Sequence, residues 1–279
     1  AQALAAVGVS EMEIGIPVMG PVEIEAIQEI ARLDLPASLM VWCRMTDADL
    51  LAARACPVDT LNLSIPVSDI HILGKLNRNR DWVLTQVDRF VRKALDAGYA
   101  VSVGCEDASR ADPAFLGEVA ETAQRAGAMR IRFADTLGIL DPFSTYDAIS
   151  ALRRRIDIGI EMHAHDDLGL ATANTLAACK AGATHANTTV NGLGERAGNA
   201  PLEEVVLGLG KLHGFQTGID LKGFLALSST VARSARRVWA VEGVARGIMP
   251  SGSSAAMNSS TGSWPSAIRS RRQSSQRSR

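Results

Sequence analysis

The chain has 279 residues, of which 47% are hydrophobic, so it is long enough to bury the core of one large domain or two modest ones. Its 29 basic and 30 acidic side chains give a formal net charge of −1, which excludes a whole-chain attraction to nucleic acid or to an acidic surface. The four cysteines have no paired spacing, which argues against a zinc knuckle or a disulfide framework. No apolar run has the length of a membrane helix, and we expect a globular cytoplasmic protein.

Seven short apolar or β-branched runs predict strands along the chain. Their ranges are 11–16, 39–44, 60–65, 100–105, 129–134, 158–165 and 185–190. Segments with helical periodicity lie between several of them, at 21–33, 81–98, 113–127, 142–155 and 171–182. Prolines stand at three expected helix starts and glycines just beyond three expected helix ends, which is typical of helix boundaries. These residues are Pro21, Pro113 and Pro142, and Gly98, Gly127 and Gly182.

Strand and helix alternate with a repeat of about 25 to 30 residues, as expected for βα units with right-handed crossovers. We predict an α/β fold, a (β/α)8 TIM barrel that lacks its first strand. A doubly wound parallel sheet is the alternative. The opening stretch AQALAAVGVS resembles the end of a helix and begins with Ala1 rather than methionine, so we expect the N-terminal part of the protein to be missing.

The composition changes after about residue 238. The stretch 251–279 is rich in serine and arginine, contains no acidic residue and has no helical or strand period. Such a segment cannot bury enough apolar surface to offset its ordering entropy. The predicted organisation is an incomplete catalytic barrel over residues 1–237 and a disordered or non-native tail over residues 238–279. An RNA-binding arm is the alternative interpretation of the tail.

The run IGIEMHAHDD, residues 158–167, carries the strongest chemical pattern. Residues two apart share one face of a strand, so Glu161, His163 and His165 point the same way at the carboxyl end of the sixth strand. Barrel enzymes carry their chemistry at that end. Two imidazoles with added oxygen ligands suit Mg²⁺, Mn²⁺ or Zn²⁺. The alternative is a structural pair of buried neutral histidines.

Other polar side chains follow neighbouring strands at the same predicted rim. They are Glu13, Arg44, Glu106, Asp107, Asp135 and Thr136. Taken singly, Asp107 and Asp135 are interpreted as helix caps or rim ion pairs. The presence of all six polar residues at one rim favours a functional site. The glycine-rich stretch 191–199 follows the last strand, where barrels often bind phosphate. His185 and His213 are interpreted as structural, and the basic loop around His71 serves either a solvated face or an anionic ligand.

These residues carry a resemblance to a known family. The stretch EMHAHDDLGLATANTLAACKAGATHANTTVNGLGERAGNAPLEE resembles the DRE-TIM metallolyases, in particular their homocitrate/isopropylmalate synthase branch. The motifs SEMEIGIPVMG, VWCR, PVSDIHILGKLNRNRDWVL, VGCEDASRAD, RFADTLGILDPF and NTTVNGLGERAGNA together look like the homocitrate synthases of nitrogen-fixing bacteria. The resemblance covers about residues 1–237.

The resemblance implies that acetyl-CoA condenses with 2-oxoglutarate to give homocitrate, for the nitrogenase iron–molybdenum cofactor, followed by thioester hydrolysis. It implies a divalent metal ion on His163 and His165, with Asn199 close to it. Glu106 takes part in the acid–base step and Glu161 supports the metal and substrate region. The intact family forms a homodimer.

The resemblance also assigns substrate contacts. Glu13 and Thr136 contact the oxoacid, His71 matches the histidine of the family's substrate loop, and Glu195 and Arg196 belong to its GxGER signature. Lysine-pathway homocitrate synthases carry an arginine for the far carboxylate of 2-oxoglutarate where this chain has Ser102. We expect another group, with Arg44 as the candidate, to serve that carboxylate.

Two further departures leave alternatives open. The family's first strand carries a TTLRDGEQ-type motif that supplies a third metal ligand and an arginine, and a later region carries a THEAGIH-like stretch with a catalytic histidine. This sequence contains neither motif. The alternatives are therefore 2-isopropylmalate or citramalate synthesis with the same metal and acetyl-CoA, or an inactive truncated or frame-shifted product.

Overall fold

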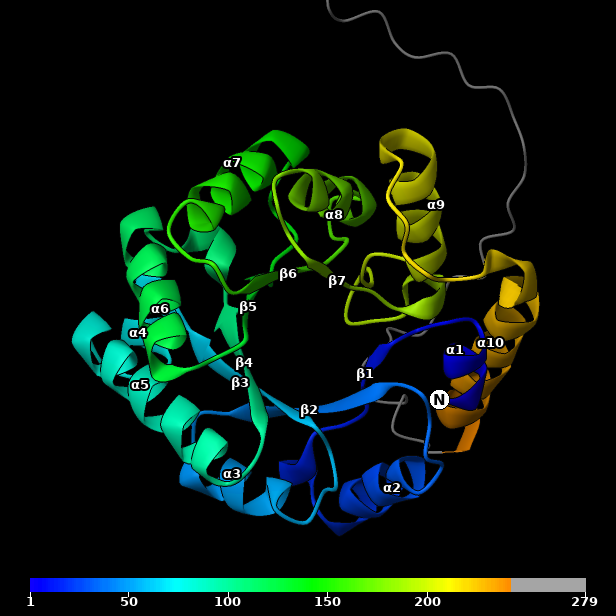
Figure 1. Cartoon of the computed structure of the whole chain (residues 1–279), viewed down its shortest axis with the longest axis horizontal. Coiled ribbons are helices and arrows are strands. Elements are labelled where there is room, and N and C mark those ends of the chain that lie inside the picture. The colour runs from blue at the N-terminus through cyan, green and yellow to red at the C-terminus, as the bar shows by residue number, and fades with distance from the viewer. Residues whose placement is uncertain (242–279) are drawn as a thin grey trace, which may run out of the picture. The chain divides into compact units, whose positions relative to one another are not determined.

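The sheet is built from seven parallel strands that pair in chain order, β1 to β7. The structure is a computed structural model that describes residues 1–241. The strands are β1 Glu11–Glu13, β2 Ser38–Arg44, β3 Thr60–Pro66, β4 Ala100–Glu106, β5 Arg130–Asp135, β6 Gly159–Ala164 and β7 His185–Asn187. Figure 1 shows the strands on a curled sheet with helices on its outer side. Within the described residues no strand joins β1 to β7. This confirms the predicted α/β barrel that lacks a strand.

Helices follow most of the strands. They lie in the compact unit Ala1–Arg236, except that the last helix, α10, continues to Val241. Their bounds are α1 Gln2–Ala6, α2 Pro21–Ala31, α3 Asp47–Ala53, α4 Asp69–Gly74, α5 Arg80–Asp96, α6 Pro113–Ala126, α7 Pro142–Arg153, α8 Ala171–Lys180, α9 Leu202–His213 and α10 Phe224–Val241. Four 3-10 turns complete the set, Pro17–Met19, Ala108–Arg110, Val190–Gly192 and Leu221–Gly223. None of these helices is long and apolar enough to cross a membrane.

Local sequence explains several helix boundaries. Prolines open α2, α6 and α7 as predicted, and the side chains of Asp112 and Asp141 accept hydrogen bonds from backbone N–H groups in the first turns of α6 and α7. Gly127 ends α6 with a φ of 104°, a conformation that glycine adopts without strain. The five predicted helices are all present, whereas α3, α4, α9 and α10 were not predicted.

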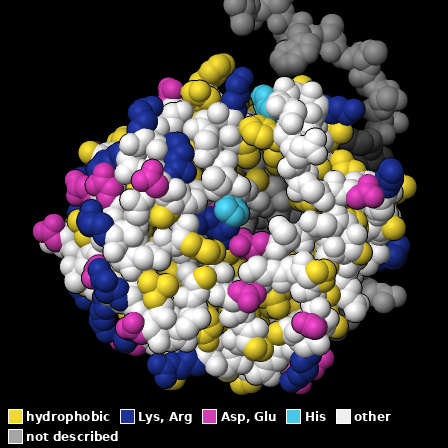
Figure 2. Space-filling model, in the orientation of Figure 1, with side chains coloured by type: hydrophobic (Ala, Val, Ile, Leu, Met, Phe, Trp, Pro, Cys, Tyr) yellow, Lys and Arg dark blue, Asp and Glu magenta, His cyan; other side chains and the backbone are white. Residues whose placement is uncertain are grey.

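Side-chain alternation separates the two faces of the curled sheet. Apolar residues such as Leu63, Val103 and Ile131 point outward into the core beneath the helices. The alternate positions point inward and are often polar, as Asn62, Ser102 and the charged residues of β5 and β6 are. Figure 2 shows histidine, acidic and basic side chains around a hollow at the centre of one face. The barrel interior is therefore a polar space built on an apolar outer layer.

A chain of ion pairs crosses this interior from β1 to β5 and β6. Glu161 lies 2.9 Å from Arg130 and 2.6 Å from Arg132, and all three side chains are buried. The two arginines reach on to β1, where Arg130 lies 2.6 Å from Glu11 and Arg132 lies 2.6 Å from Glu13. These contacts tie the edge strand β1 to the strands opposite it.

The charges in this chain of ion pairs support one another. Burial opposes ionisation of Glu161, but Arg132 and Arg130 outweigh it and leave the pKa of Glu161 below its ordinary value. Burial likewise opposes the charge on Arg132, whereas Glu161 and Glu13 raise the pKa of Arg132 above its ordinary value. Removing one member would leave a buried charge without compensation.

The tail predicted to be disordered begins at residue 238. The described part of the chain continues in α10 to Val241, and the remainder of that tail lies outside the described residues. The strand predicted at 185–190 ends earlier than expected, at Asn187. The strand predicted at 11–16 ends at Glu13.

We predict that Arg130→Ala lowers the free energy of unfolding by about 3 kcal/mol, because it leaves Glu161 with half of its buried partners. Urea denaturation followed by circular dichroism measures this change. The control is Arg92→Ala, which removes an exposed pair with Asp88 on α5 and should change stability little. Equal effects of the two substitutions would contradict a stabilising role for the interior ion pairs.

Candidate active site

Two histidines lie next to each other at the carboxyl end of β6, at the barrel mouth. Their rings are almost perpendicular, with centroids 4.8 Å apart. The Nε2 atoms of His163 and His165 lie 2.9 Å apart. The strand period that places residues 163 and 165 on one face therefore brings one nitrogen from each ring to a common point, as the sequence predicted.

Each ring is held from behind through its other nitrogen. The Nδ1 atom of His163 lies 2.8 Å from Oδ1 of Asn187, on β7. The Nδ1 atom of His165 lies 2.9 Å from Nη2 of Arg196, in the loop after β7. At His163 the ring N–H donates to an amide oxygen, and a hydrogen bond of that kind fixes the orientation of a metal-binding imidazole. At His165 the arginine donates to the ring.

Both rings are neutral near pH 7. Burial lowers the pKa of His163 to about 4, helped by the charge of Arg132. Burial also lowers the pKa of His165, and Arg196 adds to that effect. Neutral imidazole is the form that ligates metal ions, so the pair has the charge state that a metal site requires.

A third donor stands beside the pair. His165 forms an isolated antiparallel bridge with Asn199, and the buried Oδ1 atom of Asn199 accepts no hydrogen bond from the described residues. A cavity of about 720 Å³ is lined by His163, Asn199, Glu13 and Glu161, among others. Residues 1–241 contain no cluster of three His, Cys, Asp or Glu side chains arranged around a metal. Two imidazoles and one amide oxygen are the donors that these residues offer.

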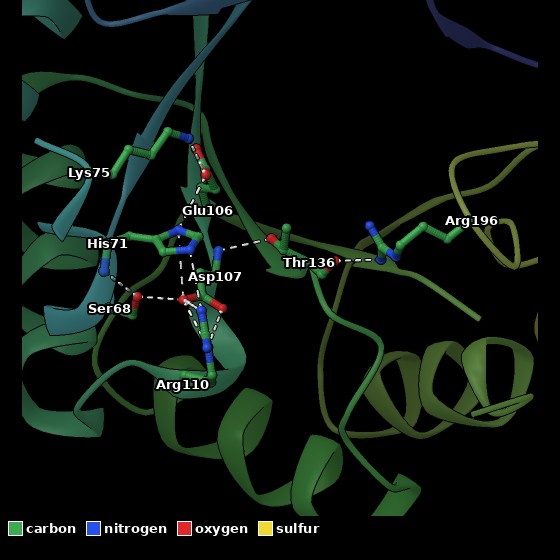
Figure 3. A network of polar contacts seen from close by, with 8 residues as sticks. All are labelled: Ser68, His71, Lys75, Glu106, Asp107, Arg110, Thr136 and Arg196. Carbon is green, nitrogen blue, oxygen red and sulfur yellow. Dashed lines mark hydrogen bonds and ion pairs between the residues drawn. The ribbon is translucent and has the colours of Figure 1, made fainter. Parts of the chain in front are cut away.

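A second polar cluster surrounds Glu106 at the end of β4 (Figure 3). The Nζ atom of Lys75 donates to Oε1 of Glu106 over 2.7 Å. The Nδ1 atom of His71 lies 3.4 Å from the same oxygen. Lys75 and His71 come from α4 and its end, one turn apart, so a single short helix positions both partners of the carboxylate.

Asp107 organises the floor of this cluster. Its backbone is left-handed, with a φ of 60°, and its buried carboxylate accepts hydrogen bonds from Ser68 and Arg110. Arg110 also lies 3.3 Å from Nε2 of His71. Because arginine only donates, Nε2 of His71 accepts and Nδ1 carries the proton that faces Glu106. The interpretation of Asp107 as a structural rim ion pair is confirmed.

Thr136 joins the two clusters (Figure 3). Its Oγ1 atom accepts a hydrogen bond from the backbone N–H of Asp107 over 2.9 Å. Its carbonyl oxygen accepts one from Nη2 of Arg196 over 2.7 Å. Polar contacts therefore run without interruption from Lys75 on one side of the mouth to His165 on the other.

The remaining predicted residues occupy different surroundings. Glu13 and Glu161 belong to the interior ion pairs described above. Arg44 is paired with Asp49, its Nη2 lying 3.0 Å from that carboxylate, and its side chain is half-exposed. Glu195 is exposed and lies 3.5 Å from Arg196. Asp135 caps the following loop by accepting from the N–H groups of Ile139 and Leu140, which confirms its structural interpretation.

Sequence reasoning missed three residues that position the site. Lys75 holds Glu106, Asn187 holds His163, and Arg132 holds Glu161. Each had a usable signal, because Lys75 stands four residues after His71 on a helix and the other two stand at inward positions of their strands. Asn187 and Lys75 lie 24 and 31 residues from their partners in the sequence, and Arg132 lies on a different strand from Glu161. Sequence spacing alone does not identify such contacts.

A family model described as HMGL-like matches residues 1–231. The chain belongs to this family. It is 49% identical over 237 residues to a protein named 2-isopropylmalate synthase 2 from Caldanaerobacter subterraneus, which covers 85% of this chain and 62% of that relative. It is 48% identical over 237 residues to a protein named homocitrate synthase from Frankia alni, with 85% and 68% covered. The chain spans less than two thirds of the length of the first relative.

A solved structure agrees with the fold. An HMG-CoA lyase from Bacillus subtilis superimposes with a TM-score of 0.72 at 20% identity, and the match covers 84% of each chain. At that identity the likeness supports the barrel architecture alone. Family membership and fold therefore agree with the resemblance that the sequence carries.

Gly138 allows the loop after β5 to approach the histidine strand. Its φ is 60°, and a Cβ atom there would lie 2.8 Å from the carbonyl oxygen of His165 and 2.9 Å from the backbone nitrogen of Asp167. We predict that Gly138→Ala lowers the free energy of unfolding by more than about 2 kcal/mol. Gly214→Ala is the control, because Gly214 has a similar φ of 70° and open space around it.

The Gly214→Ala variant should lose only about 1 kcal/mol, the strain of the left-handed backbone. Thermal and urea denaturation of both variants measure the difference. Equal losses would contradict a close-approach requirement at Gly138.

Proposed function

We propose that this chain carries the catalytic barrel of a homocitrate synthase, an acyltransferase that condenses acetyl-CoA with 2-oxoglutarate and releases CoA. The observation that carries the proposal is the pair of neutral imidazoles with Nε2 atoms 2.9 Å apart, of which His163 lines a cavity of about 720 Å³. The family match and the relatives named homocitrate synthase and 2-isopropylmalate synthase support it. A role in nitrogenase cofactor synthesis is part of the same proposal.

The residues present fit a divalent metal ion. His163, His165 and the unpartnered Oδ1 atom of Asn199 would hold it, and oxygen donors of the oxoacid would complete its ligands. When bound, the ion supplies Lewis-acid polarisation of the keto group. The cavity that His163, Asn199 and Glu161 line leaves room for the oxoacid.

Glu106 is the proposed base for the acetyl methyl group. Lys75 and His71 both contact its Oε1 atom, and among the described residues Oε2 has no hydrogen-bond partner. That oxygen is free to take the methyl proton, after which the enolate carbon forms the new bond to the keto carbon. The keto oxygen gains a proton, and water then cleaves the thioester and releases the CoA thiol.

Two further groups orient the oxoacid in this proposal. The hydroxyl of Thr136 accepts from Asp107, so its own proton is free to donate to a substrate oxygen. The Nδ1–H of His71 is fixed by Arg110 and points toward the space beside Glu106. Both donors are in place before substrate arrives, which reduces the reorganisation that catalysis requires.

A second candidate is 2-isopropylmalate synthesis, in which the oxoacid has no second carboxylate. One observation favours it: the guanidinium of Arg44, the candidate partner of that carboxylate, is engaged by Asp49. The two candidate reactions share every step above. They differ only in the part of the oxoacid that extends from the keto carbon into the barrel interior.

The oxoacid is tested by measuring release of the CoA thiol from acetyl-CoA with 2-oxoglutarate, 2-oxoisovalerate or pyruvate. We expect the highest kcat/KM with 2-oxoglutarate, and loss of at least about 100-fold in kcat for Glu106→Gln. Glu118→Gln, on the outer helix α6, is the control and should keep full activity. Preference for 2-oxoisovalerate would replace homocitrate synthesis by the second candidate, and preference for pyruvate would replace it by citramalate synthesis.

The metal site is tested by titrating the chain with Zn²⁺ in a calorimeter. We expect one site per chain, and its loss in His163→Gln and His165→Gln because each removes a ligand. His213→Gln on α9 is the control and should bind as the unaltered chain does. Binding that survives both substitutions in β6 would overturn the assignment of these histidines.

A further inference from the structure

Arg132 lies on the wall of the cavity that His163 also lines. Arg132 points into the barrel from β5, and His163 does so from β6. His163 pairs in register with Ala134, which stands two residues after Arg132. Two residues of a strand span about 7 Å, so the backbone of Arg132 lies one inward position deeper in the barrel than the histidine.

The guanidinium of Arg132 keeps one nitrogen free. Its Nη2 atom donates to Oε2 of Glu13 over 2.6 Å, and its Nε atom lies 2.6 Å from Oε1 of Glu161. Nη1 makes no hydrogen bond to the described residues, and it is not one of the buried atoms that lack a partner. Nη1 is therefore accessible, and its two N–H groups can donate into the cavity.

Arg130 resembles Arg132 in its ion pairs but not in its access to the cavity. It also contacts Glu161 and a glutamate of β1, over 2.9 Å and 2.6 Å. Its Nη1 atom is buried without a partner among the described residues, and Arg130 does not line the cavity. Both arginines therefore hold the same strands together, and of the two Arg132 alone adds a donor to the cavity wall.

A second carboxylate on the oxoacid fits this free donor. In 2-oxoglutarate three C–C bonds of about 1.5 Å separate the keto carbon from the far carboxyl carbon. With a charge-assisted hydrogen bond of about 2.8 Å, the extended chain reaches about 7 Å, which matches one inward position of a strand. We infer that Arg132 binds the far carboxylate of the oxoacid through Nη1. This inference deepens the proposed function and rests on it, because that proposal places the keto group beside His163.

The surroundings favour Arg132 over the other candidates for this carboxylate. The guanidinium of Arg44 is engaged by Asp49 through both Nε and Nη2, and the side chain is half-exposed. Ser102 is fully buried and carries no positive charge. An alkyl end in place of the far carboxylate would leave Nη1 of Arg132 facing hydrocarbon without an acceptor. That loss disfavours oxoacids with a single carboxylate.

Two matched variants test the assignment, with Kd measured by calorimetry in the presence of Zn²⁺. The ligands are 2-oxoglutarate and 2-oxopentanoate, in which a methyl group replaces the far carboxylate. Arg132→Lys keeps the charge beside both glutamates but loses the free Nη1, so we expect it to bind 2-oxoglutarate about tenfold more weakly and 2-oxopentanoate unchanged. Arg130→Lys is the control and should keep the preference of the unaltered chain. Equal losses in the two variants would overturn the inference.

A second measurement uses the unaltered chain and needs no variant that folds. In ¹H–¹⁵N spectra of the arginine side chains, the Nε signal of Arg132 should shift with 2-oxoglutarate and stay in place with 2-oxopentanoate. A larger shift at Arg130 than at Arg132 would overturn the inference.

The outcomes separate the inference from the proposed function. If the unaltered chain prefers 2-oxoglutarate and Arg132→Lys keeps that preference, the inference alone fails. If the unaltered chain binds 2-oxopentanoate at least as tightly as 2-oxoglutarate, homocitrate synthesis fails together with the inference.

Discussion

The rest of the site depends on the ion pairs that the buried carboxylate of Glu161 makes with two arginines. It lies on the strand that carries both histidines, and it is held between Arg130 and Arg132 on the neighbouring strand. A single buried charge of either sign would be costly in this interior. Paired in this way, the charges keep β5 and β6 in register, hold β1 against them through Glu11 and Glu13, and place positive charge beneath His163.

That positive charge has a direct effect at the mouth. Together with burial, Arg132 keeps His163 unprotonated, and Arg196 acts in the same sense on His165. The site therefore has an arginine next to each of the two imidazoles. The barrel thus keeps both imidazoles neutral by burial and nearby positive charge, and their ligating nitrogens remain available.

Long-range polar contacts join separate segments of the rim in two places. Around Glu106, hydrogen bonds run through Asp107, Arg110 and Thr136. Around His165, one guanidinium joins three separate segments through a few contacts. The first arrangement fixes the geometry that the proposed base requires, and the second holds the loop after β7 against the histidine strand.

The helices that sequence reasoning missed have physical explanations. The helices α3 and α4 are too short to display a hydrophobic period. Two glycines lower the helical propensity of α9, yet Gly208 is needed there, because a Cβ would lie 2.8 Å from the side chain of Leu176 on α8. Packing between neighbouring helices overrides local preference at such positions.

The sequence by itself determined the alternation of strands and helices, the proline and glycine boundaries, and the common face of Glu161, His163 and His165. These features follow from local periodicity and from backbone preferences of single residues. Only the tertiary structure decided that Arg196 contacts His165, that Lys75 holds Glu106 and that Arg44 is paired with Asp49. Those partners meet through the curvature of the sheet and the paths of its loops, which no local spacing encodes.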